Sequence, residues 1–209
     1  MNVLFLRHAK AGKGDVFMPE YIAIIICVFI LAATGGLKAV CGAVGISLFG
    51  VCYTLICVIA MSVFYIRIGV EISINLGAAV LICLPGALMK KQNSEAYGVG
   101  AVMLTAIMIA LLKHRGMMYG ADSGLLCGLM AGASALAMWD NPVCAVCSAG
   151  CIPVIVSVIG SFLSLAFSGY AAVEIGHDTI AAQLIALSIS FVIIWIHSLQ
   201  PQNAPAEKN

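Results

Sequence analysis

Long apolar runs separated by short polar stretches make up almost the whole chain. The runs are continuous and do not alternate between apolar and polar residues, which indicates helices rather than the strands of a barrel. A helix needs about 20 apolar residues to cross the hydrocarbon core of a bilayer. We therefore expect an all-α, polytopic integral membrane protein with about seven transmembrane helices, at 21–34, 39–65, 68–89, 97–112, 116–139, 142–167 and 179–199.

The polar stretches divide the chain into four parts. A polar head at 1–20 precedes a three-helix membrane segment at 21–91, and a four-helix membrane segment at 97–199 precedes a polar tail at 200–209. The first apolar run imitates a signal peptide, but we expect it to be retained as a membrane anchor. Lys and Arg are slightly more frequent on the N-terminal side of the membrane, which predicts a cytoplasmic N-terminus.

Composition excludes a water-soluble protein. Of the 209 residues, 63% are hydrophobic and 9% are charged, which leaves too few polar side chains to cover a soluble surface. A formal net charge of +1 offers no basic surface for nucleic acid. Nine cysteines lie in or beside the apolar runs, and we expect them to be buried, reduced thiols.

Five glycines recur every four residues in the fifth run. Each costs about 1 kcal/mol relative to alanine inside a helix, so we expect close helix packing to offset this cost. The stripe should pack on the fourth or the sixth helix. Near its start, Asp122 is either an ionisable group at membrane depth, and then a candidate for an ion path, or a cap at the membrane interface. The stripe consists of Gly116, Gly120, Gly124, Gly128 and Gly132.

Glu71 and Asn75 give the strongest chemical signal. They are four residues apart in the helix predicted at 68–89, and would therefore share a face. A carboxylate inside a membrane span is costly unless it is paired, protonated or hydrated. Such carboxylates typically occur where they take part in the movement of protons or cations, which makes Glu71 a candidate for an ion path. Alternatively, Arg67 pairs with Glu71 at the interface and only anchors the turn. The sequence leaves both interpretations open.

Cys144, Cys147 and Cys151 follow a C-x2-C-x3-C pattern. Zinc and iron–sulfur sites usually need a fourth ligand, which no second cysteine pair supplies. On a helix the three share one face, so packing of small side chains explains them. His114 and His177 lie at membrane edges, where we expect them to be solvated. We expect no metal, no cofactor and no catalytic residue, because the sequence contains no phosphate loop and no nucleophile elbow.

The segment GADSGLLCGLMAGA resembles the glycine-rich second helix of the B-type subunit of Mrp cation/proton antiporters. Gly124, Gly128 and Leu129 fall into the pattern of that family. Asp122 and Ser123 replace glycines of the family, and its preceding His-Asn pair is absent.

The segments LKAVCGAV and IRIGVEISINLGAAV resemble the three-helix D-type subunit of membrane-bound energy-converting hydrogenases, which are related to complex I. Lys-Ala-Val at 38–40 matches a basic turn of that family, Glu71 matches an acidic motif, and Gly77 with Ala78 matches a Gly-Ala pair. The family's second acidic residue has no counterpart here.

The two resemblances imply a non-catalytic subunit of a proton- or sodium-translocating complex in a prokaryotic inner or plasma membrane. They also imply other membrane subunits and lipid as partners, with Glu71 in the ion path. The residues themselves leave two alternatives open, namely a stand-alone transporter or channel for a small solute and a structural or assembly subunit. Few charges lie inside the runs, which favours a subunit, because solute carriers bring several polar groups together near the midplane.

Overall fold

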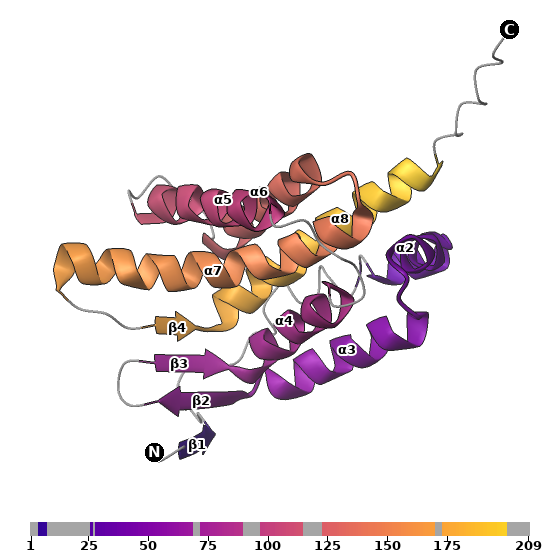
Figure 1. The fold of residues 1–209 in the computed structure, drawn as a ribbon. Helices are drawn as coiled ribbons and strands as arrows, with labels where there is room; N and C mark the ends of the chain where they lie inside the picture. Colours follow the sequence, from indigo (N-terminus) through magenta and orange to yellow (C-terminus); the bar gives the residue numbers. More distant parts are fainter. Residues whose placement is uncertain are drawn as a thin grey trace, which may run out of the picture.

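Helices make up most of the computed structural model, which describes residues 4–7, 26, 28–68, 72–89, 97–114, 123–169 and 173–199. A small sheet lies at one end of the helices (Figure 1). The helices are α2 (Gly36–Val44), α3 (Leu48–Met61), α4 (Leu76–Met89), α5 (Tyr97–His114), α6 (Ser123–Met138), α7 (Pro142–Ser168) and α8 (His177–Leu199). The strands are β1 (Leu4–Arg7), β2 (Phe64–Ile68), β3 (Ile72–Asn75) and β4 (Val173–Ile175).

Two of the described helices, α7 and α8, are long and apolar enough to cross a membrane. Their apolar lengths are 26 and 23 residues. Together α2 and α3 would provide a third span, but they are bent by 96° relative to each other. Both α5 and α6 are apolar but shorter. The predicted helical fold is confirmed, and helix length alone supports fewer spans than the seven that the hydropathy pattern predicts.

The continuous helix predicted at 39–65 is wrong, because the chain turns sharply between α2 and α3. Gly45 ends α2 with φ 74° and ψ 27°, a left-handed conformation that glycine adopts at little steric cost. Ser47 then caps α3, since its hydroxyl accepts a hydrogen bond of 3.0 Å from the Gly50 N–H. The predicted turn at Lys38 instead lies inside α2.

The helix predicted at 68–89 is also wrong in its first part. Ile68 pairs with Ile72 in an antiparallel β2–β3 ladder, and α4 begins only at Leu76. Strand β1, from the head predicted to be polar, pairs antiparallel with β2, and β4 pairs parallel with β3. Ile72 and Ile74 alternate with Ser73 and Asn75 in β3, a period of two that suits a strand.

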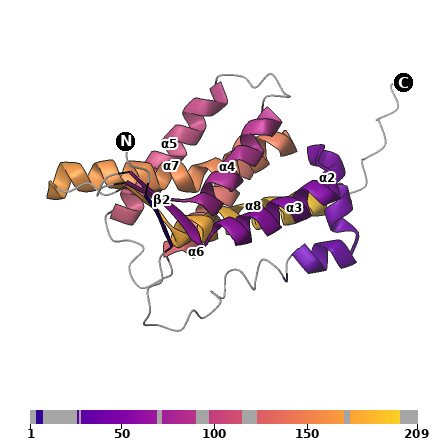
Figure 2. The same ribbon diagram turned by 90° about the horizontal axis from the view of Figure 1, so that it is seen from below.

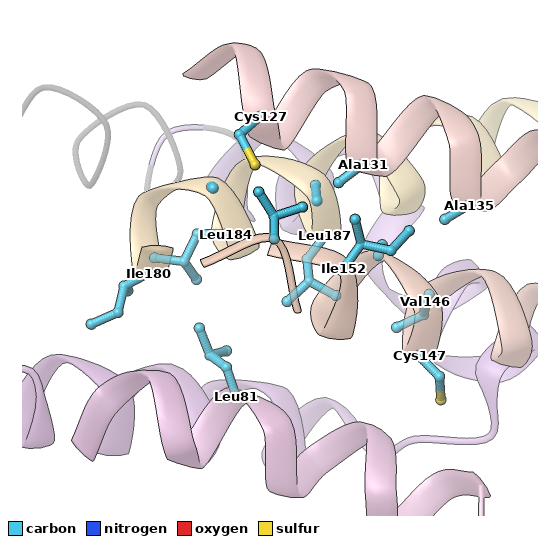
Figure 3. Packing of buried hydrophobic residues seen from close by; sticks show 14 of the residues in the cluster. Leu81, Cys127, Ala131, Ala135, Val146, Cys147, Ile152, Ile180, Leu184 and Leu187 are labelled. Carbon is cyan, nitrogen blue, oxygen red and sulfur yellow. The ribbon is translucent and has the colours of Figure 1, made fainter. Parts of the chain in front are cut away.

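The two predicted membrane segments share one buried cluster. It contains Val58 and Leu81 from the first segment together with Ile152 and Ile180 from the second. Figure 3 shows Leu81 pointing from α4 toward side chains of α7 and α8. A second cluster, built on Leu31, Leu37, Cys41 and Val51 of the first segment, packs against Trp195 of α8. Both hydrophobic clusters therefore bring residues of the two segments together.

Helix α2 lies beside the C-terminal half of α8 (Figures 1 and 2). The contact is close, because a Cβ at Gly36 would lie 2.9 Å from the ring of Trp195. The most extensive helix contact, however, joins α6 to α8. Helices α7 and α8 together form the centre of the fold, because both pack against α2, α4 and α6, and α7 packs against α5 as well.

Candidate functional site

A polar cleft with a volume of about 590 Å³ lies where α5, α7, the start of α8 and the sheet meet. This volume falls within the range of about 300–1,000 Å³ that is usual for small-molecule sites. In Figure 1 the region is at the left, where α7 ends and α8 begins. The ionisable side chains that line it are Tyr65, Lys113, His114, Glu174, His177 and Asp178.

Charges of both signs line this cleft. Lys113 and His114 come from the last turn of α5, while Glu174, His177 and Asp178 come from β4 and the first turn of α8. Among the described residues, no ion pair joins any two of these five side chains. Lys113 and His114 also complement the negative end of the α5 dipole, as Asp178 complements the positive end of α8.

Helix α7 supplies a wall of hydroxyl groups. Ser157, Ser161 and Ser164 line the cleft at i, i+4 and i+7 and therefore fall on one helical face. The Ser157 hydroxyl donates to the Pro153 carbonyl oxygen at 3.1 Å, and its oxygen lies 2.9 Å from that of Thr179 in α8. The hydroxyl pair thus ties α7 to α8 at the cleft. A Cβ at Gly160 would meet no atom within 4 Å, which leaves this part of the wall open.

Tyr65 of β2 lines the sheet side of the cleft. Its ring meets the His177 ring edge-on, with 5.7 Å between the ring centroids. Burial raises the pKa of Tyr65, the nearby Asn75 amide opposes this effect, and the carboxylates of Glu174 and Asp178 raise the pKa further. Because the net shift is upward, the phenol keeps its proton at neutral pH and remains a hydrogen-bond donor at the cleft.

Asn75 lies next to this site but has a structural role in the fold. It is fully buried at the end of β3, where its Nδ2 donates to the Ser62 carbonyl oxygen at 2.7 Å and its Oδ1 accepts from the Gly77 N–H at 2.8 Å. The predicted helical face that would hold Glu71 and Asn75 together is wrong, because Asn75 belongs to a strand. Glu71 lies outside the described residues. Arg67 lies in β2, opposite Ser73 of β3.

Two glycines of the predicted stripe, Gly128 and Gly132, lie close to another helix, which is not one of the two predicted neighbours. A Cβ at Gly128 would lie 2.7 Å from the Ala182 carbonyl oxygen, and one at Gly132 would lie 3.0 Å from that of Ala186. Both contacts are with α8 and not with the predicted neighbours, which correspond to α5 and α7. Gly124 lies in α6 as well, whereas Gly116, Gly120 and Asp122 lie outside the described residues.

The three cysteines of the C-x2-C-x3-C pattern lie in α7, on a part of the helix that packs against other helices. Cys144 and Cys147 are buried, Cys151 is half-buried, and none of the three forms a disulfide bond. Cys147 lies in the main hydrophobic cluster (Figure 3). In the described part of the chain, no group of three or more His, Cys, Asp or Glu side chains is placed to hold a metal ion.

Sequence reasoning missed most of this cleft. His114 is exposed, as expected for a solvated histidine, and His177 is half-buried. The sequence did not indicate that both line one cleft together with the serines of α7. The spacing of Ser157, Ser161 and Ser164 inside a long apolar run was the available signal, since it puts three hydroxyl groups on one helical face. Each of these hydroxyls also donates to the carbonyl oxygen four residues earlier in α7.

The chain was also compared with family models, curated proteins and solved structures, and none of the three comparisons finds a match. The functional argument therefore rests on the cleft itself.

Proposed function

We propose that the protein is a transporter or channel that admits a small polar solute or ion into a membrane-embedded helical bundle through the polar cleft. The observation that carries this proposal is the convergence of ionisable groups of both signs with the hydroxyl wall of α7. Polar groups gathered between membrane helices are expensive and typically mark a substrate or ion pathway. The polar groups that seemed too scarce in the sequence come together here from five separate elements, namely β2, α5, α7, β4 and α8.

Large apolar side chains on the outer helix faces support the membrane setting. Phe49, Tyr53 and Ile56 of α3 are 79%, 61% and 65% exposed, and Phe162 of α7 is 63% exposed. Moving one such side chain from water into an apolar environment gains about 1.5–3 kcal/mol. We place the seven apolar runs across a prokaryotic inner or plasma membrane, with the N-terminus in the cytoplasm.

A subunit of a proton- or sodium-translocating complex is the second candidate. It is favoured by the titratable residues of the cleft, because histidines and carboxylates between membrane helices can relay protons. The cleft would then be part of an ion path, and neighbouring subunits would cover part of the exposed apolar faces. Glu71 and Asp122 remain candidates for the same path.

Ligand-dependent thermal stability tests the proposal. A ligand that binds only the folded protein adds about 2.7 kcal/mol of stability at a concentration 100 times its Kd. We expect the Tm of the detergent-purified protein to rise with at least one member of a panel of amino acids, small carboxylates, amines and alkali cations. Lys113→Met or Asp178→Asn should weaken this rise.

Asp140→Asn is the matched control, because Asp140 is an exposed carboxylate that does not line the cleft. A Tm rise that all three variants retain would place the binding site elsewhere and contradict the proposal. Purification in mild detergent separates the two candidates, since a stand-alone transporter should run as one chain type and a subunit should retain unrelated chains.

A further inference from the structure

Gln183 is a fully buried amide on α8, one helical turn beyond the cleft residue Thr179. Its Nε2 donates to the Gly150 carbonyl oxygen of α7 at 2.9 Å. This contact fixes the orientation of the amide, because a carbonyl oxygen can only accept. The remaining amide atom, Oε1, has no hydrogen-bond partner among the described residues. A buried acceptor without a donor is destabilising, so Gln183 Oε1 is available to a ligand that enters between α7 and α8.

Helix α7 offers further acceptor oxygens at the same level. Pro153 lies inside α7 and has no N–H, so the Ala149 carbonyl loses the partner that an α-helix would give it. The next carbonyl, that of Gly150, is the one that Gln183 contacts. Backbone carbonyls released in this way coordinate cations in several transporter folds.

These oxygens lie in line with the cleft. Contacts between Ser157 and Thr179 and between Gly150 and Gln183 show that α7 and α8 run antiparallel. The step from Thr179 to Gln183 is four residues, or about 6 Å along the helix axis. The hydroxyl pair therefore forms the inner end of the cleft, and the Gln183 amide lies one step deeper between the same two helices.

We propose that the cleft leads to an inner site at which Gln183 Oε1 and the α7 carbonyl oxygens beside Pro153 bind a monovalent cation. The cation is an alkali metal ion or the ammonium group of a solute, since both present one positive charge to oxygen acceptors. The inner oxygens include no carboxylate, which disfavours a divalent ion. Glu174 and Asp178 at the cleft attract cations toward it. This inference rests on the proposed function and assigns it a ligand class.

The test is the Tm of the detergent-purified protein in sodium, potassium or methylammonium chloride, with N-methyl-D-glucamine chloride holding the ionic strength constant. We expect a saturable rise with at least one of the three small cations. A response to sodium or potassium alone identifies an alkali metal site, and a response to methylammonium alone identifies an ammonium site. A wild-type protein without a saturable response to any of them overturns the inference.

Two substitutions at Gln183 locate the site. Gln183→Met keeps the side-chain length and removes the amide, so the half-saturating cation concentration should rise about tenfold or more. Gln183→Glu keeps acceptor oxygens and adds a negative charge, so the half-saturating cation concentration should fall. This second variant tests the site even if Gln183→Met does not fold. Ser190→Ala is the control, because Ser190 is a buried α8 residue whose hydroxyl donates to Ala186 in its own helix.

The outcomes separate this inference from the proposed function. A cation response that is lost in Asp178→Asn but unchanged in both Gln183 variants keeps the cleft as the site and contradicts the inner site. A response that persists in the Asp178 and Gln183 variants alike contradicts both proposals.

Discussion

At Gly128 the backbone of α6 lies very close to α8. A Cβ there would lie 2.7 Å from the Ala182 carbonyl oxygen and 2.8 Å from the Ile185 Cβ. Neither atom belongs to the far end of a flexible side chain, so the two helices would have to separate to admit a methyl group. The missing side chain is therefore what permits this contact.

We expect Gly128→Ala to destabilise the protein. Overpacking typically costs about 1–3 kcal/mol, which exceeds the gain of about 1 kcal/mol that alanine brings to a helix. Gly100→Ala in α5 is the matched control, because a Cβ there meets no atom within 4 Å. Thermal unfolding in detergent should show a lower Tm for the first variant and an unchanged or higher Tm for the second. Equal Tm values would show that the stripe is not an interface.

Asn75 illustrates how far a single residue can be interpreted from the sequence. An amide inside an apolar run is costly unless it is hydrogen-bonded, and Asn75 is fully buried with both ends of its amide bonded. Its partners, the Ser62 carbonyl and the Gly77 N–H, follow from the junction between β3 and α4. That junction was not predicted, so the amide was assigned to a helical face instead.

At the level of elements, Gly45 and Ser47 determine where α2 ends, where α3 begins and therefore the angle between the two helices. The left-handed Gly45 ends α2, and the Ser47 cap starts α3 in a direction 96° away. They resemble the residues at the start of α7, where Asn141 is the N-cap and Pro142 lies in the first turn. They were missed because they lie within a continuous apolar run, where membrane hydropathy favours one long helix.

Gly45→Ala should destabilise the protein by about 1–2 kcal/mol, because an L-residue is disfavoured at φ 74°. Gly42→Ala lies in the same helix, at a position with no atom within 4 Å of a new Cβ, and should be neutral or stabilising. Chemical unfolding of both variants in detergent measures the difference. Two variants of equal stability would contradict the assigned turn.

The strands were the elements that hydropathy could not reveal. The strands at 64–68 and 72–75 are short and directly adjoin apolar helices in the sequence. Their alternating pattern was therefore not recognised, and their residues were assigned to the longer helices predicted at 39–65 and 68–89. Isolated helices with clear ends were predicted within about two residues, as expected for element boundaries. Examples are α5, α7 and α8, whose observed bounds are 97–114, 142–168 and 177–199.

At the scale of the whole molecule, the cleft unites residues that are far apart in the sequence. Tyr65, Lys113, Ser157 and Glu174 come from four elements and meet only because of how α5, α7, α8 and the sheet pack. Hydropathy identifies which residues enter a membrane, but it contains no information on which helix faces which neighbour. The site could therefore not be assembled from the sequence, although its serines could have been noticed.

The proposed seven spans predict that the two chain termini lie on opposite sides of the membrane. Epitope tags at Met1 and Asn209, tested by protease protection in inverted and right-side-out vesicles, measure this arrangement. The tag at the N-terminus should be accessible from the cytoplasmic side and the tag at the C-terminus from the other side. Tags on the same side would require an even number of spans and would contradict the proposed topology.

The most direct test of the account is whether the cleft between α5, α7 and α8 contains water while the protein is in a bilayer. Ser161 lines the cleft, whereas its neighbour Phe162 is 63% exposed on the outer face of α7. Ser161→Cys and Phe162→Cys, reconstituted in lipid vesicles, can be labelled with a membrane-impermeant, positively charged methanethiosulfonate, with the native cysteines of the unmodified protein as background. The account predicts rapid labelling of Ser161→Cys and none above background for Phe162→Cys, because only a hydrated thiol ionises and reacts. Labelling of Phe162→Cys with Ser161→Cys unreactive would show that the cleft is closed to water and would contradict its proposed role.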